Sequence, residues 1–221
     1  ALLERVQQLS TVNLLCPTIL ETAQPLAETG WRVRLSDGRE LTTRLLVGAD
    51  GAQSKVRELA DVPVSGWNYD QQAVVGYVRT AKPHQDTAWQ RFLPTGPLAF
   101  LPLHDGRCSI VWSTTTEQAE ALLALDESAF AGALADAFDQ RLGAILEVGR
   151  RSAFPLRLQH AQAYVKPGLA LIGDAAHVVH PLAGQGVNLG LLDAATLAEV
   201  LLDAVDAGQD FASFKTLRRY E

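Results

Sequence analysis

The sequence has two cysteines, no methionine and no long uninterrupted apolar segment, and these shortages exclude several classes of protein. Cys16 and Cys108 lie far apart and outside any metal-ligand spacing, so we expect free thiols in a reducing compartment. The most apolar stretches are interrupted by charged or polar residues such as Asp174, His177 and Asp193. None therefore reaches the roughly 18 to 20 residues of a membrane span. We expect a soluble chain and leave peripheral membrane contact open.

Basic residues are also in the minority, with 19 Lys and Arg against 25 Asp and Glu, and they are scattered along the chain. A nucleic-acid partner is disfavoured because it requires a basic stripe. The 221 residues suffice for one large domain or two small ones with a real hydrophobic core. The first residue is Ala1, and residues 1–9 already show the pattern of an amphipathic helix without a preceding cap. With methionine absent, this leads us to expect a piece of a longer protein.

The apolar pattern predicts two α/β-like ends around an antiparallel middle. Near the start, a short strand is followed by a hairpin whose turn is Asp37-Gly38, because glycine tolerates positive φ. The continuous apolar run 45–49 predicts a strand buried on both faces. A second such strand is predicted at 169–172, and a long Leu/Ala helix from about 188 to 206.

Between these ends, short strand-like runs within residues 72–113 are separated by turn residues, which predicts an antiparallel meander. Residues 117–146 have helical periodicity, with Ala121, Leu122, Leu125, Phe130, Leu134 and Phe138 on one stripe. We therefore predict a mixed α/β fold (α/β with α+β character), in which a substrate domain is inserted into a partial nucleotide-binding domain. Residues 1–65 and 155–221 would form the nucleotide-binding domain, and 66–154 the antiparallel-sheet substrate domain.

The segment after the second buried strand carries the strongest candidate site. Gly173 and Asp174 stand at the carboxyl end of that strand, where α/β folds place ligands. The small residues Ala175 and Ala176 let a large group approach, and the next helix would present free N–H groups. An acidic side chain suits the hydroxyls of a sugar-like chain, and a helix start suits an electron-rich ring. A flavin meets both demands, whereas the alternative is a plain strand–loop–helix joint.

A second polar segment follows the first buried strand. Asp50-Gly51 stands just past it, with Ser54 and Arg57 on the following turn. Asp-Gly is among the commonest turn dipeptides, so this pair alone carries little information.

Together the two segments carry a family resemblance. Residues 173–188 resemble the second FAD motif of the FAD-dependent aromatic-ring hydroxylases, and 50–57 resemble that family's D-G-x-x-S-x-x-R segment. The resemblance implies the para-hydroxybenzoate hydroxylase fold, with FAD and NAD(P)H as cofactors. It implies that Pro181 lines the flavin face where oxygen reacts. The cofactor-binding residues it implies are Asp50, Gly51, Arg57, Gly173, Asp174, Ala175, Gly184, Gln185, Gly186, Val187 and Asn188.

Nearly the whole chain further resembles the bacterial ubiquinone-biosynthesis hydroxylases, through the phrases AWQRFLPTGPLAFLPLHDGRCSIVWS, AFPLRLQHAQAYVKPGLALIGDAAH and HPLAGQGVNLG. It is similar to both the octaprenylphenol and the methoxy-methyl-benzoquinol hydroxylase branches. This implies an NAD(P)H- and O2-dependent monooxygenase that hydroxylates a polyprenylated phenol or benzoquinol. Such an enzyme would be cytoplasmic, with peripheral contact to the inner membrane or to a ubiquinone-biosynthesis complex left open.

The sequence departs from the family in one respect. A family member begins with a βαβ unit carrying G-x-G-x-x-G, which holds the ADP half of FAD, and no such motif occurs here. Three alternatives therefore remain: a catalytically incomplete piece, a non-catalytic assembly subunit of the same fold, and a flavin reductase of the same superfamily.

The remaining candidates are weaker. His177 and His180 lack the further ligands of a metal set, so we expect packing at the flavin loop and no metal. Residues 98–103 and 110–112 predict either the floor of an apolar substrate pocket or a plain sheet core. Arg91 and Arg107 are expected to be solvated charges.

Overall fold

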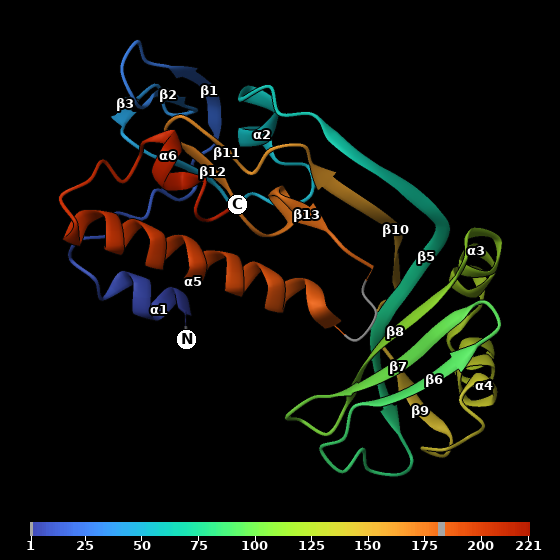
Figure 1. Cartoon of the computed structure of the whole chain (residues 1–221). Helices are drawn as coiled ribbons and strands as arrows, with labels where there is room; N and C mark the ends of the chain where they lie inside the picture. Colours follow the sequence, from blue (N-terminus) through green and yellow to red (C-terminus); the bar gives the residue numbers. More distant parts are fainter. Residues whose placement is uncertain (1, 181–183) are drawn as a thin grey trace. The chain divides into compact units, whose positions relative to one another are not determined.

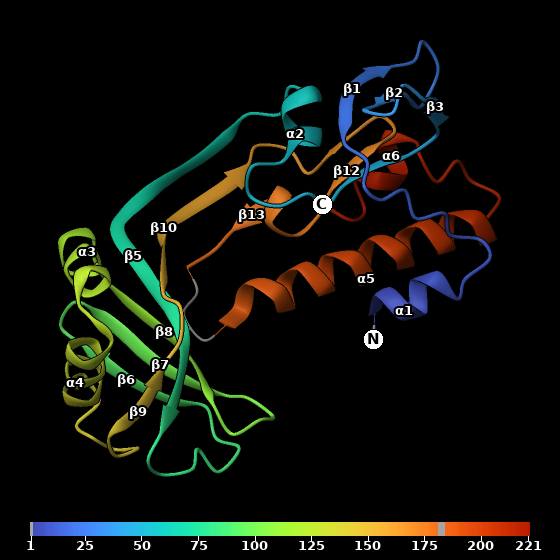
Figure 2. The same cartoon turned by 180° about the vertical axis from the view of Figure 1, so that it is seen from behind.

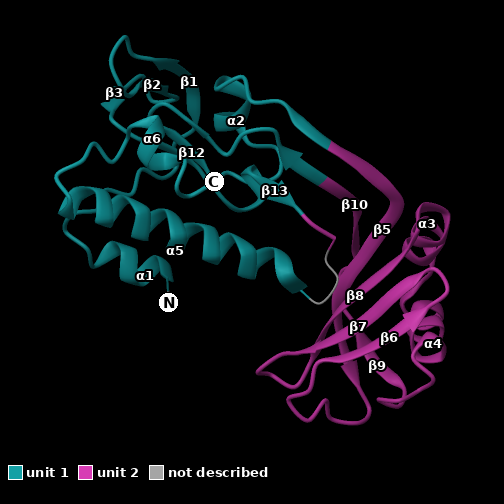
Figure 3. Cartoon of the chain, viewed as in Figure 1, with its two compact units in different colours: residues 1–65, 159–178, 184–221 teal, residues 66–158, 179–183 magenta. Residues whose placement is uncertain are grey.

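The computed structural model describes residues 2–180 and 184–221, and the chain divides into two compact units. One unit consists of residues 1–65, 159–178 and 184–221, and the other of residues 66–158 and 179–183 (Figure 3). Several sheets and helices alternate along the chain, so the predicted mixed α/β class is confirmed.

The centre of the first unit is a three-stranded sheet with the order β11-β12-β4. Strand β12 (Leu169–Leu171) pairs in parallel with β4 (Leu46–Gly48) and antiparallel with β11 (Val165–Lys166). All three residues of β12 are fully buried, as predicted. The prediction that the first strand is buried on both faces is wrong, because β4 is an edge strand among the described residues and Val47 is 37% exposed.

A second sheet in this unit contains the predicted hairpin. Its strands are β1 (Leu20–Pro25), β2 (Trp31–Leu35) and β3 (Glu40–Thr43), all antiparallel neighbours. The turn between β2 and β3 contains Gly38 with φ of 84°, the left-handed conformation that glycine tolerates best. Burial alternates strictly along β2, and Trp31 donates from Nε1 to the carbonyl of Pro167 at 3.2 Å. The hairpin is thereby joined to the segment that precedes β12.

The helices of the first unit are short except for one. They are α1 (Leu2–Gln7), α2 (Lys55–Leu59), α5 (Gln185–Asp206) and α6 (Phe214–Leu217) (Figures 1 and 2). Helix α5 begins three residues before the predicted start. It buries Leu197, Val200 and Ala204, which share one helical face. The first two of these pack with Ala170 of β12 and with Leu217 of α6. Among the helices that the structure describes, none combines the length and apolarity needed to cross a bilayer.

The second unit contains the predicted antiparallel strands, but only the last three form a meander, because the first strand pairs with the last one. Their order is β5-β8-β7-β6, formed by β5 (Val64–Thr80), β6 (Trp89–Leu93), β7 (Gly96–Pro102) and β8 (Cys108–Thr115). Strand β9 (Ile145–Val148) pairs with β5, so the predicted helical region stops before residue 145. It contains two helices, α3 (Thr116–Ala124) and α4 (Glu127–Ala137). Strand β10 (Ser152–Ala161) leads back to the first unit, where its end pairs with the short β13 (His177–Val178).

Side chains along β7 and β8 alternate between two faces of the sheet. Leu98, Phe100, Ile110 and Trp112 are buried in one core with Phe130, Leu134 and Phe138 of the α4 segment. Those four side chains are therefore sheet core. The intervening residues of β7 and β8 point to the opposite face, because side chains of neighbouring residues alternate. Of the predicted helical stripe, Ala121 is exposed rather than buried.

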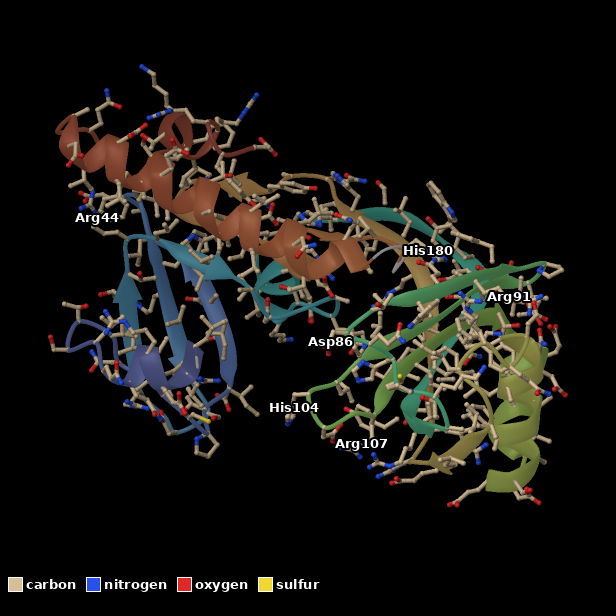
Figure 4. All side chains as sticks on the ribbon, turned by 90° about the horizontal axis from the view of Figure 1, so that it is seen from below. Arg44, Asp86, Arg91, His104, Arg107 and His180 are labelled. Atoms are coloured by element: carbon tan, nitrogen blue, oxygen red, sulfur yellow. The ribbon has the colours of Figure 1, made fainter. Side chains whose placement is uncertain are left out.

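The two arginines expected to be solvated differ in their surroundings. Arg91 on β6 (Figure 4) donates from Nη1 to the carbonyl of Ala137 at 2.8 Å and pairs with Asp139. It therefore satisfies a carbonyl at the end of α4, and the prediction of a merely solvated charge is wrong for this residue. Arg107 pairs with Asp105 within an exposed turn and lowers the pKa of that carboxyl to about 2.

Candidate functional site

The parallel pairing of β4 with β12 brings the two polar segments to the same edge of the sheet. Leu171 lies opposite Gly48, and Ile172 donates its N–H to the Gly48 carbonyl at 2.9 Å. The chain then turns away from the sheet on both strands through glycines in the left-handed region, Gly51 with φ of 82° and Gly173 with φ of 58°. Segments more than a hundred residues apart in sequence thus meet at one place.

A cleft of about 350 Å3 opens at this edge. Five of the predicted site residues line it, and they come from both strand ends and from the first turn of α5. These five are Gly51, Gly173, Asp174, Gly186 and Val187, and Ala49, Ile172 and Gly190 complete the lining. Since most of these residues carry small or no side chains, a ligand can approach the backbone closely.

The start of α5 forms one wall of the cleft. Gly184 precedes the helix with φ of 65°, and no acidic residue stands in the first turn. The first N–H groups of a helix lack intrahelical partners and carry its positive dipole end. A Cβ on Gly190 would lie 3.2 Å from the Cα of Gly173, so a glycine at 190 lets the helix approach the strand end. This wall suits an anionic or electron-rich group.

The 3-10 turn η1 (Gly173–Ala175) presents Asp174 at the cleft, where the residue is exposed. Ala175 and Ala176 are buried beneath it, with exposed fractions of 0% and 1%. Their small side chains allow this close packing, but they do not line the cleft. Gln185 and Asn188 are exposed on the first turns of α5 and also lie outside the lining.

The side chains of Asp50 and Ser54 form hydrogen bonds within the chain. The Asp50 carboxylate accepts from the Ser54 hydroxyl and from the N–H of Val56, the latter at 3.0 Å. Ser54 is the N-cap of α2, and its Oγ accepts from the Arg57 N–H at 3.0 Å. The structure thus places Asp50 as a brace of the α2 start, adjacent to Gly51 of the cleft.

Arg57 connects the two segments. Its Nη1 donates to the carbonyl of Ala175 at 2.8 Å, and its Nη2 donates to the carbonyl of Ala52 at 2.8 Å. Gln159 donates to the same Ala52 carbonyl at 3.0 Å. The planar guanidinium is suited to bridging two acceptors in this way.

Asp193, which the sequence did not single out as a site residue, contacts the turn at the cleft. The Asp193 carboxylate on α5 accepts from the Gly173 N–H and lies 2.7 Å from Nε2 of His177. The only signal in the sequence was an acidic residue interrupting an apolar helix, and that signal does not identify a partner.

Two tyrosines lie near the end of β12, one bonded to Leu171 and one beside His177. Tyr220 donates its hydroxyl to the carbonyl of Leu171 at 2.8 Å, and burial raises the pKa of this phenol well above its usual range. The Tyr164 ring lies 5.8 Å from the ring of His177, and its hydroxyl lies 2.7 Å from Nε2 of His160. Burial, followed by the charge of Asp193, raises the pKa of Tyr164.

The remaining predicted residues belong to the second unit or are not described. His180 (Figure 4) packs edge-on against Tyr69 with ring centroids 5.0 Å apart, and burial lowers its pKa. Pro181 lies outside the described residues. Within residues 2–180 and 184–221, no cluster of histidine, cysteine and acidic side chains has the arrangement of a metal site.

A larger cavity in the first unit has a different character. It measures about 620 Å3 and lies between the β1–β2 turn and α2. Lys166 lines this cavity, and its ammonium group donates to the carbonyls of Ala60 and Asp61 at 2.7 and 2.9 Å. None of the predicted cofactor-binding residues lines this cavity, so its larger volume is not a reason to place the cofactor there.

The fold brings two strand ends, an exposed carboxylate and the start of a long helix together around one cleft, which is the arrangement of a ligand-binding α/β domain. The chain belongs to the FAD binding domain family, whose sequence pattern matches residues 23–220. The predicted resemblance to FAD-dependent aromatic hydroxylases is thereby confirmed.

Individual relatives agree with this family. The chain is 42% identical to the human "Ubiquinone biosynthesis monooxygenase COQ6, mitochondrial", over 93% of this chain and 50% of that protein. It is 42% identical to the Escherichia coli "3-demethoxyubiquinol 3-hydroxylase", over 86% of this chain and 48% of that protein. The crystal structure of Pseudomonas aeruginosa PqsL with 2-aminobenzoylacetate matches with a TM-score of 0.85 and 30% identity, over 99% of this chain and 61% of that one. The chain thus spans about half the length of the curated relatives it matches.

Proposed function

We propose that the whole protein containing this chain is a flavin-dependent monooxygenase of ubiquinone biosynthesis. It would hydroxylate a polyprenylated phenol or benzoquinol with NAD(P)H and O2. The observation that carries this proposal is the meeting of Gly51, Gly173-Asp174 and the start of α5 around one cleft. The names of relatives at about 42% identity support the substrate class.

The residues of the cleft fit the flavin end of FAD. Gly51 and Gly186 carry no side chain, and a Cβ built on either would meet no atom of the chain within 4 Å. The space beside them is therefore open to a planar ring or its attached chain. Asp174 offers an exposed carboxylate at the same cleft, which suits the ribityl hydroxyls. The N–H groups of the first turn of α5 suit the electron-rich edge of the ring.

FAD, when bound, would supply the two-electron chemistry that links NAD(P)H oxidation to O2 activation. The residues of this chain would bind and orient it. We propose that Asp174 accepts hydrogen bonds from the ribityl chain and that Val187 and Asn188 stand at the ring edge. Asp50 and Arg57 would then act by shaping the Gly51 turn, through the hydrogen bonds described above. No described side chain is needed as an acid or base in this scheme.

The meander offers an apolar surface to the substrate. Ala99, Leu101 and Val111 share the face of the sheet that points away from the α4 core. Phe92 of β6 lies on the same face, since it pairs with Pro97, and its side chain is 72% exposed. We propose that this face contacts the aromatic ring or the first prenyl unit. A polyprenyl tail is soluble in lipid, so we further propose that the whole protein works at a membrane surface.

The test is product analysis with the whole protein. Purified enzyme, FAD, NADH or NADPH and a short-chain prenylated phenol are incubated under 18O2, and the product is analysed by mass spectrometry. The proposal predicts one 18O atom in the aromatic product and NAD(P)H oxidation that is accelerated by the phenol. NAD(P)H oxidation that is indifferent to phenol, with no labelled product, would instead indicate a flavin reductase. A protein that binds no FAD would contradict the proposal altogether.

A further inference from the structure

Asp193 makes a contact that no part of the proposed function accounts for. It lies on α5, less than one turn beyond Gly190 of the cleft, and its carboxylate reaches back to the strand end. We infer that Asp193 is a positioning residue that holds the Gly173–Ala175 turn against α5, so that Asp174 is presented to FAD. This inference rests on the proposed function and names a residue through which the cleft is built.

The geometry of this contact is specific. A single oxygen, Oδ2, lies 2.7 Å from the Gly173 nitrogen and 2.7 Å from Nε2 of His177. Gly173 begins the turn and His177 follows it, so the two partners flank Asp174 on either side. An ionised carboxylate only accepts hydrogen bonds, so His177 must donate from Nε2. Charge-assisted hydrogen bonds of this length are among the stronger ones in proteins.

Burial strengthens the contact. The side chains of His177 and Asp193 are 12% and 17% exposed, so water competes little for either. The Tyr164 ring packs beside His177 with centroids 5.8 Å apart and restricts its orientation. By contrast, Asp203 on the same helix forms an exposed ion pair with Arg219, with side-chain exposures of 54% and 48%.

The hydrogen bonds that Ala176 and Arg57 make to the turn do not connect it to α5. The Ala176 N–H bonds to the Gly173 carbonyl within the turn, and Arg57 holds the Ala175 carbonyl toward α2. Arg57 and Asp193 both bond to the turn through their side chains, and it is the Asp193 bond that links the turn to α5. Gly173 and Gly186 both line the cleft, and the Asp193 bond joins the turn and the helix that carry them.

A first test needs no flavin. The whole protein is labelled with 15N-histidine, and the His177 imidazole is assigned by comparison with His177→Gln. The inference predicts a protonated Nε2 with a slowly exchanging, downfield proton, lost in Asp193→Ala and retained in Asp203→Ala. A His177 ring whose Nε2 signal is the same in wild type and Asp193→Ala would overturn it. The spectra are recorded on protein from which any flavin has been removed, so this result does not depend on the proposed function.

A second test separates positioning from general stabilisation by a double-mutant cycle on FAD affinity. Fluorescence titration of the apoprotein, at a temperature where all variants are folded by circular dichroism, gives the FAD dissociation constant. We expect Asp193→Ala to weaken FAD binding about 10- to 100-fold, as loss of a positioning contact does. Asp203→Ala should change it by less than about twofold.

The cycle is completed with Asp174. If Asp193 acts through Asp174, then Asp193→Ala should cost less than about threefold in an Asp174→Ala background. An equal loss in both backgrounds would mean that Asp193 only stabilises the fold, and the inference would be wrong. If wild type binds no FAD, the proposed function fails, and the imidazole signal still decides whether the Asp193 contact exists.

Discussion

Replacing Arg57 with alanine separates the bridging role of this residue from direct contact with a cofactor. In the structure the guanidinium donates to the carbonyls of Ala175 and Ala52, both at 2.8 Å. The Ala52 carbonyl keeps a second donor, Gln159, at 3.0 Å, whereas Ala175 is fully buried. The main cost of the substitution therefore falls on the Ala175 carbonyl.

An orphaned buried acceptor costs about 1 to 3 kcal/mol. We therefore expect Arg57→Ala to lower the free energy of unfolding of the apoprotein by about 2 kcal/mol. Arg57→Lys should recover only part of this, because one ammonium does not span two carbonyls as a planar guanidinium does. Arg34→Ala is the matched control, since Arg34 pairs with Glu21 at 3.2 Å in the exposed hairpin. That change should cost about 0.5 kcal/mol or less.

The assay is equilibrium unfolding in urea, followed by circular dichroism in the absence of flavin. If Arg57→Ala were no less stable than Arg34→Ala, the bridge between the two segments would be energetically unimportant. Any effect on flavin binding would then have to come from direct contact between Arg57 and the cofactor.

Three further predictions concern the helix start, the strand end and the pH dependence. Gly186→Ala should stabilise the apoprotein by about 0.5 kcal/mol through helix propensity. The same change should raise the FAD dissociation constant, because Gly186 lines the cleft. A gain in stability without a loss of FAD affinity would contradict the placement of FAD. Tyr220→Phe should cost about 1 kcal/mol in urea unfolding, since its hydroxyl bonds to the Leu171 carbonyl, and an unchanged midpoint would contradict this. Burial lowers the pKa of His180 in the folded protein. At pH values between this lowered pKa and the ordinary histidine pKa near 6.5, the unfolded state therefore binds more protons than the folded state. The neutral, buried His180 therefore contributes its full share of folding free energy above about pH 6.5, and this share is lost as the pH falls. When the pH is lowered from about 7.5 to 5.5, the free energy of unfolding should fall less in His180→Gln than in wild type.

Much of the fold could be predicted because the relevant signals are local. Burial alternates along Trp31–Leu35 as the sequence alternates, and Gly38 takes the left-handed turn for which a glycine is needed. Within residues 72–113, the strands β6, β7 and β8 form an antiparallel meander because short turns join neighbouring strands. The pairing of β5 with β8 joins strands that are distant in sequence, and no local signal predicts it. Two apolar strands, each followed by a polar segment, indicated that the segments could meet. The parallel register of Leu171 with Gly48 makes them meet.

The parts that could not be predicted depend on partners distant in sequence. Periodicity identifies the face of a helix that is buried, but it does not show that Asp193 reaches Gly173 and His177. A carboxylate such as Asp50 can bind a ligand or brace a helix, and only the positions of Ser54 and Val56 show the second role. The exposure of Val47 likewise follows from β4 being an edge strand, which no local pattern reports.

The measurement that tests the central claim most directly is the flavin content of the whole protein carrying Asp174→Ala. Wild type, Asp174→Ala and the control Asp203→Ala are purified in parallel, and FAD per chain is determined from the flavin absorbance after denaturation. If the cleft beside Gly173 and the start of α5 holds the flavin, wild type and Asp203→Ala retain FAD and Asp174→Ala loses most of it. Equal flavin content in all three would contradict the assignment of this cleft.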